Sequence, residues 1–242
     1  STSLRRFLEW CDDAGIEDMN DLDSELIDRF KEWRLDDVKP ITARNDMRTI
    51  SNFIEYAESI QAVPVGMSDL IRIPKVSEDD EICDDVLTRQ EARAILDHLS
   101  KYEYASNRHI CLLILWKTGM RISGLRALDV RDFDEARPAL EVRHRVDTKT
   151  PLKRKEKSER DVIVSPDTAD VIADYIDTQR PNTTDKFGRA ALLATREGRA
   201  ARTTIQKYVY TATRPCTYNG EKCPYDRDTE TCEALAFDQP NK

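Results

Sequence analysis

The chain has 242 residues, of which 39% are hydrophobic and 35% charged, and its formal net charge at pH 7 is −8. This length allows one large domain or two modest ones, each with its own core. The sequence holds no apolar run of the length that spans a membrane and its first residues are polar, so neither a membrane span nor a signal peptide is predicted. It starts at Ser1 without a methionine, which suggests a processed or shortened chain.

The charges are unevenly distributed along the chain. Residues 12–37 hold eleven acidic and three basic side chains, residues 143–160 three acidic and eight basic ones, and residues 186–214 one acidic and seven basic ones. Basic segments on an otherwise acidic chain favour a polyanionic partner. A protein from a halophilic source would have such an acidic surface and would keep basic residues where it binds a polyanion such as DNA. The alternative is an acidic cytoplasmic protein with two basic loops.

Residues 1–63 are predicted to form a small helical unit. Ser3 and Asp23 are candidate caps of the first two helices. The second helix has an apolar face made of Leu26, Ile27, Phe30 and Trp33. Pro40 begins a third helix, and helical spacing predicts a buried stripe of Ala43, Met47, Ile50, Ile54 and Ala57.

Arg44 and Arg48 lie one turn apart on another face of this third helix, so both could reach successive phosphates of a nucleic acid. A solvated helix face explains two such arginines equally well. Residues 71–85 follow, with prolines and an acidic run, and are predicted to be a linker.

The second domain is predicted to begin with a helix, because Thr88 and Glu91 have the spacing of a capping box. Residues 112–116 are all apolar and predict a fully buried segment, which Gly119 breaks. Arg121 stands between this segment and a short helix. An arginine there can hold a phosphate or a carboxylate, or it can cap or pair locally.

Alternating valines and leucines predict a β-hairpin, with Leu140, Val142 and Val146 on one strand and Val162 and Val164 on the other. The connecting loop, residues 147–159, reads DTKTPLKRKEKSE and holds four lysines and one arginine. A helix is predicted from Asp167 and a short strand over residues 190–195. A further helix follows Gly198. It buries Ile205, Tyr208 and Val209 and exposes Arg202, Thr203, Thr204 and Lys207, a composition that suits contact with a nucleic acid.

The segment TGMRISGLRALDVRDF at residues 118–133, preceded by LTRQEARAIL at 87–96, resembles the first catalytic box of the tyrosine recombinase (phage integrase) family. That box usually reads T-G-L-R-I-S-E-L, and here Gly124 stands in place of the glutamate. The resemblance implies a mainly α fold with a small antiparallel β-sheet. It also implies a SAM-like helical core-binding domain at residues 1–70, a linker at 71–85 and an incomplete catalytic domain at 86–242.

The resemblance implies roles for residues of both domains. Arg121 would bind the scissile phosphate, and a lysine of the hairpin loop would enter the minor groove and protonate the leaving 5′ oxygen. Counting back from Arg160 favours Lys155, whereas the local pattern after Pro151 favours Lys153, and both stay open. The implied DNA contacts are Thr42, Arg44 and Arg48 in the first domain and Arg202, Thr203, Thr204 and Lys207 in the second.

The family's remaining chemistry is an H-x-x-R box followed by a tyrosine nucleophile. His98, His109 and His144 are followed three residues later by lysine, leucine and aspartate, so this sequence holds no such box. We therefore expect a cytoplasmic recombinase fragment that binds double-stranded DNA without cleaving it, self-associates on DNA, and has no membrane or small-molecule partner. The alternative is a non-catalytic DNA-binding regulator derived from an integrase.

Three cysteines cluster near the end of the sequence, at Cys216, Cys223 and Cys232. No cofactor is required by the family's chemistry, but the loop-rich surroundings of these thiols also suggest a structural zinc site. The alternatives are free thiols or a disulfide formed during purification. A cysteine-rich interaction module would retain zinc and show no salt-dependent DNA affinity.

Overall fold

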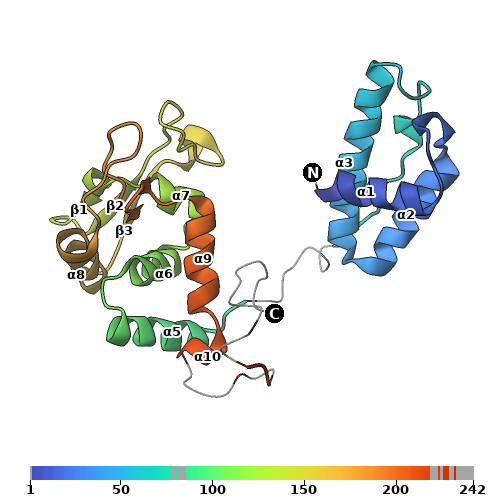
Figure 1. Ribbon diagram of the computed structural model, residues 1–242. Helices are drawn as coiled ribbons and strands as arrows, with labels where there is room; N and C mark the ends of the chain where they lie inside the picture. Colours follow the sequence, from blue (N-terminus) through green and yellow to red (C-terminus); the bar gives the residue numbers. More distant parts are fainter. Residues whose placement is uncertain are drawn as a thin grey trace. The chain divides into compact units, whose positions relative to one another are not determined.

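The computed structural model of the chain describes residues 2–77, 80, 86–218, 223, 226–228 and 232. The chain forms two compact units, Ser1–Val86 and Leu87–Lys242, and each has its own hydrophobic core (Figure 1). It is mainly helical with small antiparallel sheets, as the sequence predicts. Within the described residues, no helix is both long enough and apolar enough to cross a bilayer.

The first unit contains α1 (Thr2–Asp13), α2 (Ser24–Asp37), α3 (Pro40–Ser59) and two short 3-10 helices (Met19–Asp21 and Ser68–Leu70). Asp23 caps α2 as predicted, because its side chain accepts the Leu26 N–H at 2.8 Å. Ser3 is not a cap, since α1 already begins at Thr2. Pro40 opens α3, where its missing N–H costs nothing.

The core of the first unit is built on α3. All five residues of the predicted stripe on this helix are buried, and the rings of Phe7 and Trp10 meet that of Phe30 edge-on at 5.0 and 5.5 Å. The prediction for Trp33 was wrong, since this residue is 37% exposed. Arg34 is buried in its place and donates to Asp46 at 2.7 Å, so the inward face of α2 includes an ion pair that hydrophobic periodicity does not detect.

The second unit holds more elements, and its helices are α5 (Arg89–Tyr102), α6 (Asn107–Thr118), α7 (Ile122–Ala127), α8 (Pro166–Asp174), α9 (Arg202–Ala212) and α10 (Pro215–Tyr218). Its strands are β1 (Phe133–Asp134), β2 (Ala139–Val142), β3 (Arg160–Ile163), β4 (Ala194–Thr195) and β5 (Gly198–Arg199). Two 3-10 helices (Val130–Asp132 and Lys155–Ser158) and a π-helical turn (Tyr175–Gln179) complete it. The predicted capping box of α5 is present, with Thr88 and Glu91 bonded reciprocally.

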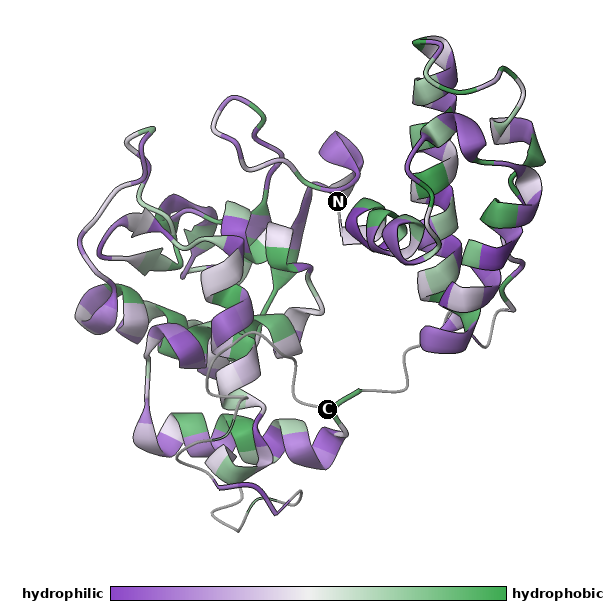
Figure 2. Cartoon of the chain, turned by 45° about the vertical axis from the view of Figure 1, so that its right-hand side comes forward, coloured by the Kyte–Doolittle hydropathy of each residue, from purple (hydrophilic) through white to green (hydrophobic). Residues whose placement is uncertain are grey.

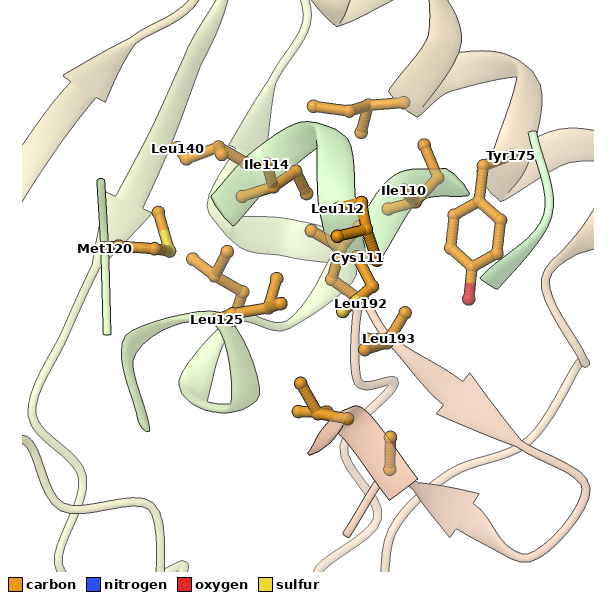
Figure 3. Packing of buried hydrophobic residues seen from close by; sticks show 14 of the residues in the cluster. Ile110, Cys111, Leu112, Ile114, Met120, Leu125, Leu140, Tyr175, Leu192 and Leu193 are labelled. Atoms are coloured by element: carbon orange, nitrogen blue, oxygen red, sulfur yellow. The ribbon is translucent and has the colours of Figure 1, made fainter. Parts of the chain in front are cut away.

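Helix α6 forms the centre of the second core and contacts α5, α7, α8 and α9. Its residues Ile110, Cys111, Leu112 and Ile114 lie among side chains from the other elements (Figure 3). The prediction that the whole run 112–116 is buried was wrong at Trp116, which is 45% exposed. Five consecutive apolar residues lie all round a helix, so they cannot all face the same core, and burial ends after Ile114.

The hairpin prediction is confirmed by a three-stranded antiparallel sheet of order β1-β2-β3, in which Leu140 pairs with Val162. Val146 lies beyond the end of β2 and is 62% exposed. The strand predicted over 190–195 is shorter than expected, since only β4 pairs with β5 there. Figure 2 shows hydrophobic and hydrophilic residues alternating along the helices of both units, as expected for amphipathic helices packed on a core.

Candidate nucleic-acid interface

The position of Arg121 is set by the way α6 ends. Gly119 is the C-cap of α6 in the left-handed conformation, with φ of 60°, and donates its N–H to the Leu115 carbonyl at 3.0 Å. Met120 is buried and anchors the turn. Arg121 is then the N-cap of α7, and its carbonyl accepts the Gly124 N–H at 2.8 Å. The backbone of Arg121 is therefore held at both sides.

The side chain of Arg121, in contrast, is exposed. Arg121 occupies the N-cap position of α7 through its backbone, but its side chain makes no capping hydrogen bond. No ion pair involving its guanidinium occurs in the described part of the chain. A fixed backbone and an unpaired guanidinium leave the planar fork available to an external anion.

Arg121 lies in a groove with a volume of about 910 Å³. We call it the cationic groove, because its lining includes the five cations Arg121, Arg126, Lys149, Lys153 and Arg202 and no acidic residue. The rest of its lining is Ile122, Ser123, Thr150, Pro151, Leu152 and Ala201. Five positive charges without a counter-charge favour a polyanion.

The loop between β2 and β3 forms one wall of this groove. Within the loop, Arg145 and Thr150 form an isolated antiparallel β-bridge. The Thr150 N–H donates to the Arg145 carbonyl at 2.9 Å. Lys149 has a φ of 55°, in the left-handed region, and its carbonyl accepts a bond from Arg126 Nη1 at 3.2 Å. Leu152 is buried and donates its N–H to Nδ1 of His144 at 2.9 Å. These contacts fix the loop up to Lys153.

Of the two candidate lysines, the structure brings Lys153 together with Arg121 in the lining of the cationic groove. Lys155 begins the 3-10 helix Lys155–Ser158 with a φ of 51° and is not part of that lining. Of these two candidates, the geometry thus favours Lys153, which shares the groove lining with Arg121 and with a further lysine, Lys149.

Helix α9 contributes the opposite wall. Arg202 is its first residue and lines the cationic groove, while Thr203 and Lys207 are exposed and Thr204 is half-buried. The sequence predicted these four on the outer side, and only Arg202 reaches the groove itself.

A buried ion-pair network supports the groove from below, and sequence reasoning missed it. Asp129 pairs with Arg199 and lies 3.4 Å from Arg189 Nη1. Asp132 accepts two bonds from Arg145 at 2.8 and 2.6 Å. The D-x-x-D spacing of residues 129 and 132, which form a capping box, was the available signal. The network ties the end of α7 to the β2–β3 loop and to β5.

Asp185 belongs to the same network. Burial alone would raise the pKa of its carboxyl, but N–H bonds from Arg189 and Phe187 and the guanidinium of Arg199 outweigh burial and lower the pKa to about 2. Asp185 is therefore ionised at neutral pH and neutralises arginines of the network.

In the first unit, the three predicted contact residues lie on α3. Thr42 and Arg48 are exposed, whereas Arg44 is half-buried and its Nε is hidden from solvent. Arg48 is thus the more available of the two arginines.

The proposed zinc site gains no support. Cys216, in α10, and Cys223 and Cys232 are free thiols. Among the residues that the structure describes, no group of three or more histidine, cysteine, aspartate or glutamate side chains is placed to hold a metal ion.

Comparison with known proteins agrees with this geometry. The family model described as Phage integrase family matches residues 85–219. Among solved structures, a fragment of the Tn1549 transposon integrase in complex with a circular intermediate DNA gives a TM-score of 0.61 at 16% identity, covering 90% of this chain and 71% of that one. A lambda integrase dimer bound to a COC′ core site gives 0.56 at 14% identity, covering 81% and 65%.

A lambda integrase tetramer bound to a Holliday junction also gives a TM-score of 0.56 at 14% identity, covering 80% of this chain and 50% of that one. No curated protein matches the sequence. The chain therefore spans between one half and about seven tenths of these solved integrases. The family match takes in α5 through α10, with Arg121 and every residue of the cationic groove, and the chain belongs to the phage integrase family.

Proposed function

We propose that this chain binds duplex DNA as part of a site-specific tyrosine recombinase, with the scissile phosphate held in the cationic groove. One observation carries the proposal: on an integrase fold, the arginine of the first catalytic box lines a groove with five cations and no acid. The Tn1549 integrase fragment was solved in complex with a circular intermediate DNA and the lambda integrases bound to a core site or a Holliday junction, which supports the same partner here.

Each wall of the groove has a distinct role in this proposal. The planar guanidinium of Arg121 donates to the non-bridging phosphate oxygens, where it stabilises developing negative charge. Lys153, on the β2–β3 loop, is the general acid that protonates the leaving 5′ oxygen. Arg202, with Thr203, Thr204 and Lys207 further along α9, contacts the adjoining backbone.

The first unit supplies the second half of the DNA contact. We assign residues 1–70 to a core-binding domain that contacts the duplex through Thr42, Arg44 and Arg48, with residues 71–85 linking it to the catalytic domain. Ile71 packs in the core of the first unit, so this assignment is narrowed to a linker of residues 72–85. The dimeric and tetrameric lambda complexes support self-association of this protein on DNA. DNA as the partner makes the cytoplasm the compartment that this proposal assigns.

We further propose that these 242 residues bind DNA without cleaving it. None of the three histidines begins an H-x-x-R box, and without that box no tyrosine is assigned as the nucleophile. The same absence favours a second candidate, a non-catalytic DNA-binding regulator. Such a protein would behave identically in the binding and cleavage assay described next.

The experiment measures binding and cleavage together. Fluorescence anisotropy with a labelled duplex should show an affinity that falls steeply and log-linearly with salt concentration, with a slope of about −0.9 for each phosphate neutralised. Incubation with a nicked suicide duplex should give no covalent protein–DNA product on a denaturing gel. Salt-independent binding would contradict the DNA proposal, and a covalent adduct would contradict the non-cleaving state.

A further inference from the structure

A second, smaller hollow adjoins the cationic groove. Its volume is about 260 Å³, and its lining is Arg126, Thr148, Lys149, Asp185, Lys186, Phe187, Glu197 and Arg199. We call it the side hollow. Arg126 and Lys149 line both depressions, so the two are continuous across these side chains.

The side hollow carries an excess of positive charge. Four of its lining residues are basic and two are acidic, and one of the acids, Asp185, is already paired with Arg189 and Arg199. Lys149 and Lys186 form no ion pair among the described residues. Glu197 is exposed at the edge and leaves the hollow with a net positive charge.

Arg126, at the junction, lies close to other cations. Burial, together with the positive charges of Arg199 and Arg189, lowers the pKa of its guanidinium below the ordinary arginine value. Burial is the larger cause of this shift; the contributions of Arg199 and Arg189 show that the charges nearest Arg126 include cations, beside which an anion is favoured. The side chain is held there by its bond to the Lys149 carbonyl at 3.2 Å.

Thr148 also lines the side hollow. Its hydroxyl oxygen is hidden from solvent and has no hydrogen-bond partner among the described residues, so the hydroxyl is not counted as a contact for a ligand in the hollow. At the rim, the Lys186 ammonium lies 5.2 Å from the centre of the Phe187 ring, which holds the cation at the mouth.

We propose that the side hollow binds a backbone phosphate of DNA next to the one held by Arg121, with Lys149 and Lys186 as its cationic contacts. This inference rests on the proposed function, because it extends the DNA track from the cationic groove across Arg126. A backbone contact positions the duplex without reading its sequence, so its contribution is the same for every duplex.

The test uses Lys186→Ala and a matched control, Lys101→Ala. Lys101 is an exposed lysine of the same unit that also lies over a neighbouring ring, that of Tyr102 at 5.0 Å, but it lines neither depression. Anisotropy titrations of the full chain with two duplexes of unrelated sequence are carried out over a salt series, and thermal unfolding checks the fold of both variants.

Lys186→Ala should bind several-fold more weakly than the parent to both duplexes, and its salt slope should be smaller in magnitude by about 1. Lys101→Ala should match the parent. If the parent binds with the expected salt dependence and both variants have the affinity and salt slope of the parent, the side hollow is not a phosphate site. The proposed function stands in that case. If the parent shows no salt-dependent binding, both proposals fail.

Discussion

Gly124, the third residue of α7, occupies the position where the integrase family usually has glutamate. A Cβ built on this glycine would meet Met120 Cβ and Sδ at 3.7 Å, an ordinary contact distance, and its φ lies outside the left-handed region. Nothing in the packing therefore requires glycine here. A glycine within a helix costs about 0.5–1 kcal/mol relative to alanine, chiefly through backbone entropy.

Gly124→Ala should accordingly raise the free energy of unfolding by about 0.5–1 kcal/mol in urea denaturation. The control is Gly198→Ala, because a Cβ at that position would lie 2.7 Å from the Thr184 carbonyl oxygen and its φ is +107°. Gly198→Ala should destabilise the protein clearly. A destabilised Gly124→Ala would show that this turn of α7 cannot accept even one methyl group.

Asp185 makes folding stability depend on pH. Its pKa is lowered to about 2 in the folded state, against about 4 for an unperturbed aspartate. Because the pKa is lower in the folded state, the carboxylate stabilises the folded protein at pH values above the pKa of the unfolded state. This stabilisation is lost as the pH falls from about 4 towards 2. The difference in unfolding free energy between the parent and Asp185→Asn should be largest at pH 5 and shrink towards pH 2. A constant difference over this range would contradict the role given to the carboxylate.

At the scale of elements, α2 and α3 are joined by the buried ion pair of Arg34 and Asp46, whose side chains are 5% and 9% exposed. Asp46→Ala leaves the buried guanidinium of Arg34 with Asp37 as its remaining partner and should cost at most about 3–5 kcal/mol in urea unfolding. Asp28→Ala is the matched control, because Asp28 pairs with Lys31 on α2 with 35% of its side chain exposed, and it should cost at most about 1 kcal/mol. Equal effects of the two substitutions would contradict this account.

Local signals predicted individual elements well. The stripe on α3, the cap of α2 and the capping box of α5 all follow from residues within a few positions of one another, and all are confirmed. Periodicity failed at Trp33 and Trp116 because it reports that a residue is apolar and not whether a neighbour covers it.

The candidate site was predicted only in part, for a related reason. Arg121 was found because its motif is contiguous in sequence, and Lys153 because it lies in a recognisable loop. The network beneath them joins Asp129 to Arg189 and Arg199, which are 60 and 70 positions away, and no local pattern encodes such a pairing. Arg126 and Lys149 were missed because the groove brings together a residue of α7 and one of the β2–β3 loop, and no local pattern encodes that meeting.

For the whole molecule, the net charge of −8 is combined with a strongly cationic groove. We expect KCl to have opposite effects on folding and on binding. Screening of the acidic surface should raise the unfolding temperature as KCl is increased, whereas the same salt should weaken DNA binding. Thermal unfolding and anisotropy over one KCl series measure both. An unfolding temperature that does not rise would contradict the halophilic interpretation of the acidic surface.

The most direct test of the central claim, that Arg121 holds a DNA phosphate, compares Arg121→Ala with Arg137→Ala. Arg137 is an exposed arginine of the same unit, paired with Asp134, Glu141 and Asp161, and it lies outside the groove lining. Because the Arg121 guanidinium has no ion-pair partner among the residues that the structure describes, its loss should change the unfolding free energy by no more than about 0.5 kcal/mol.

The decisive measurement is the dissociation constant for a labelled duplex over a salt series. Arg121→Ala should bind about tenfold more weakly or worse, since a charge-assisted hydrogen bond contributes about 1.5–3 kcal/mol, and its salt slope should be smaller in magnitude by about 1. Arg137→Ala should match the parent. A folded Arg121→Ala protein with the affinity and salt slope of the parent would contradict the account.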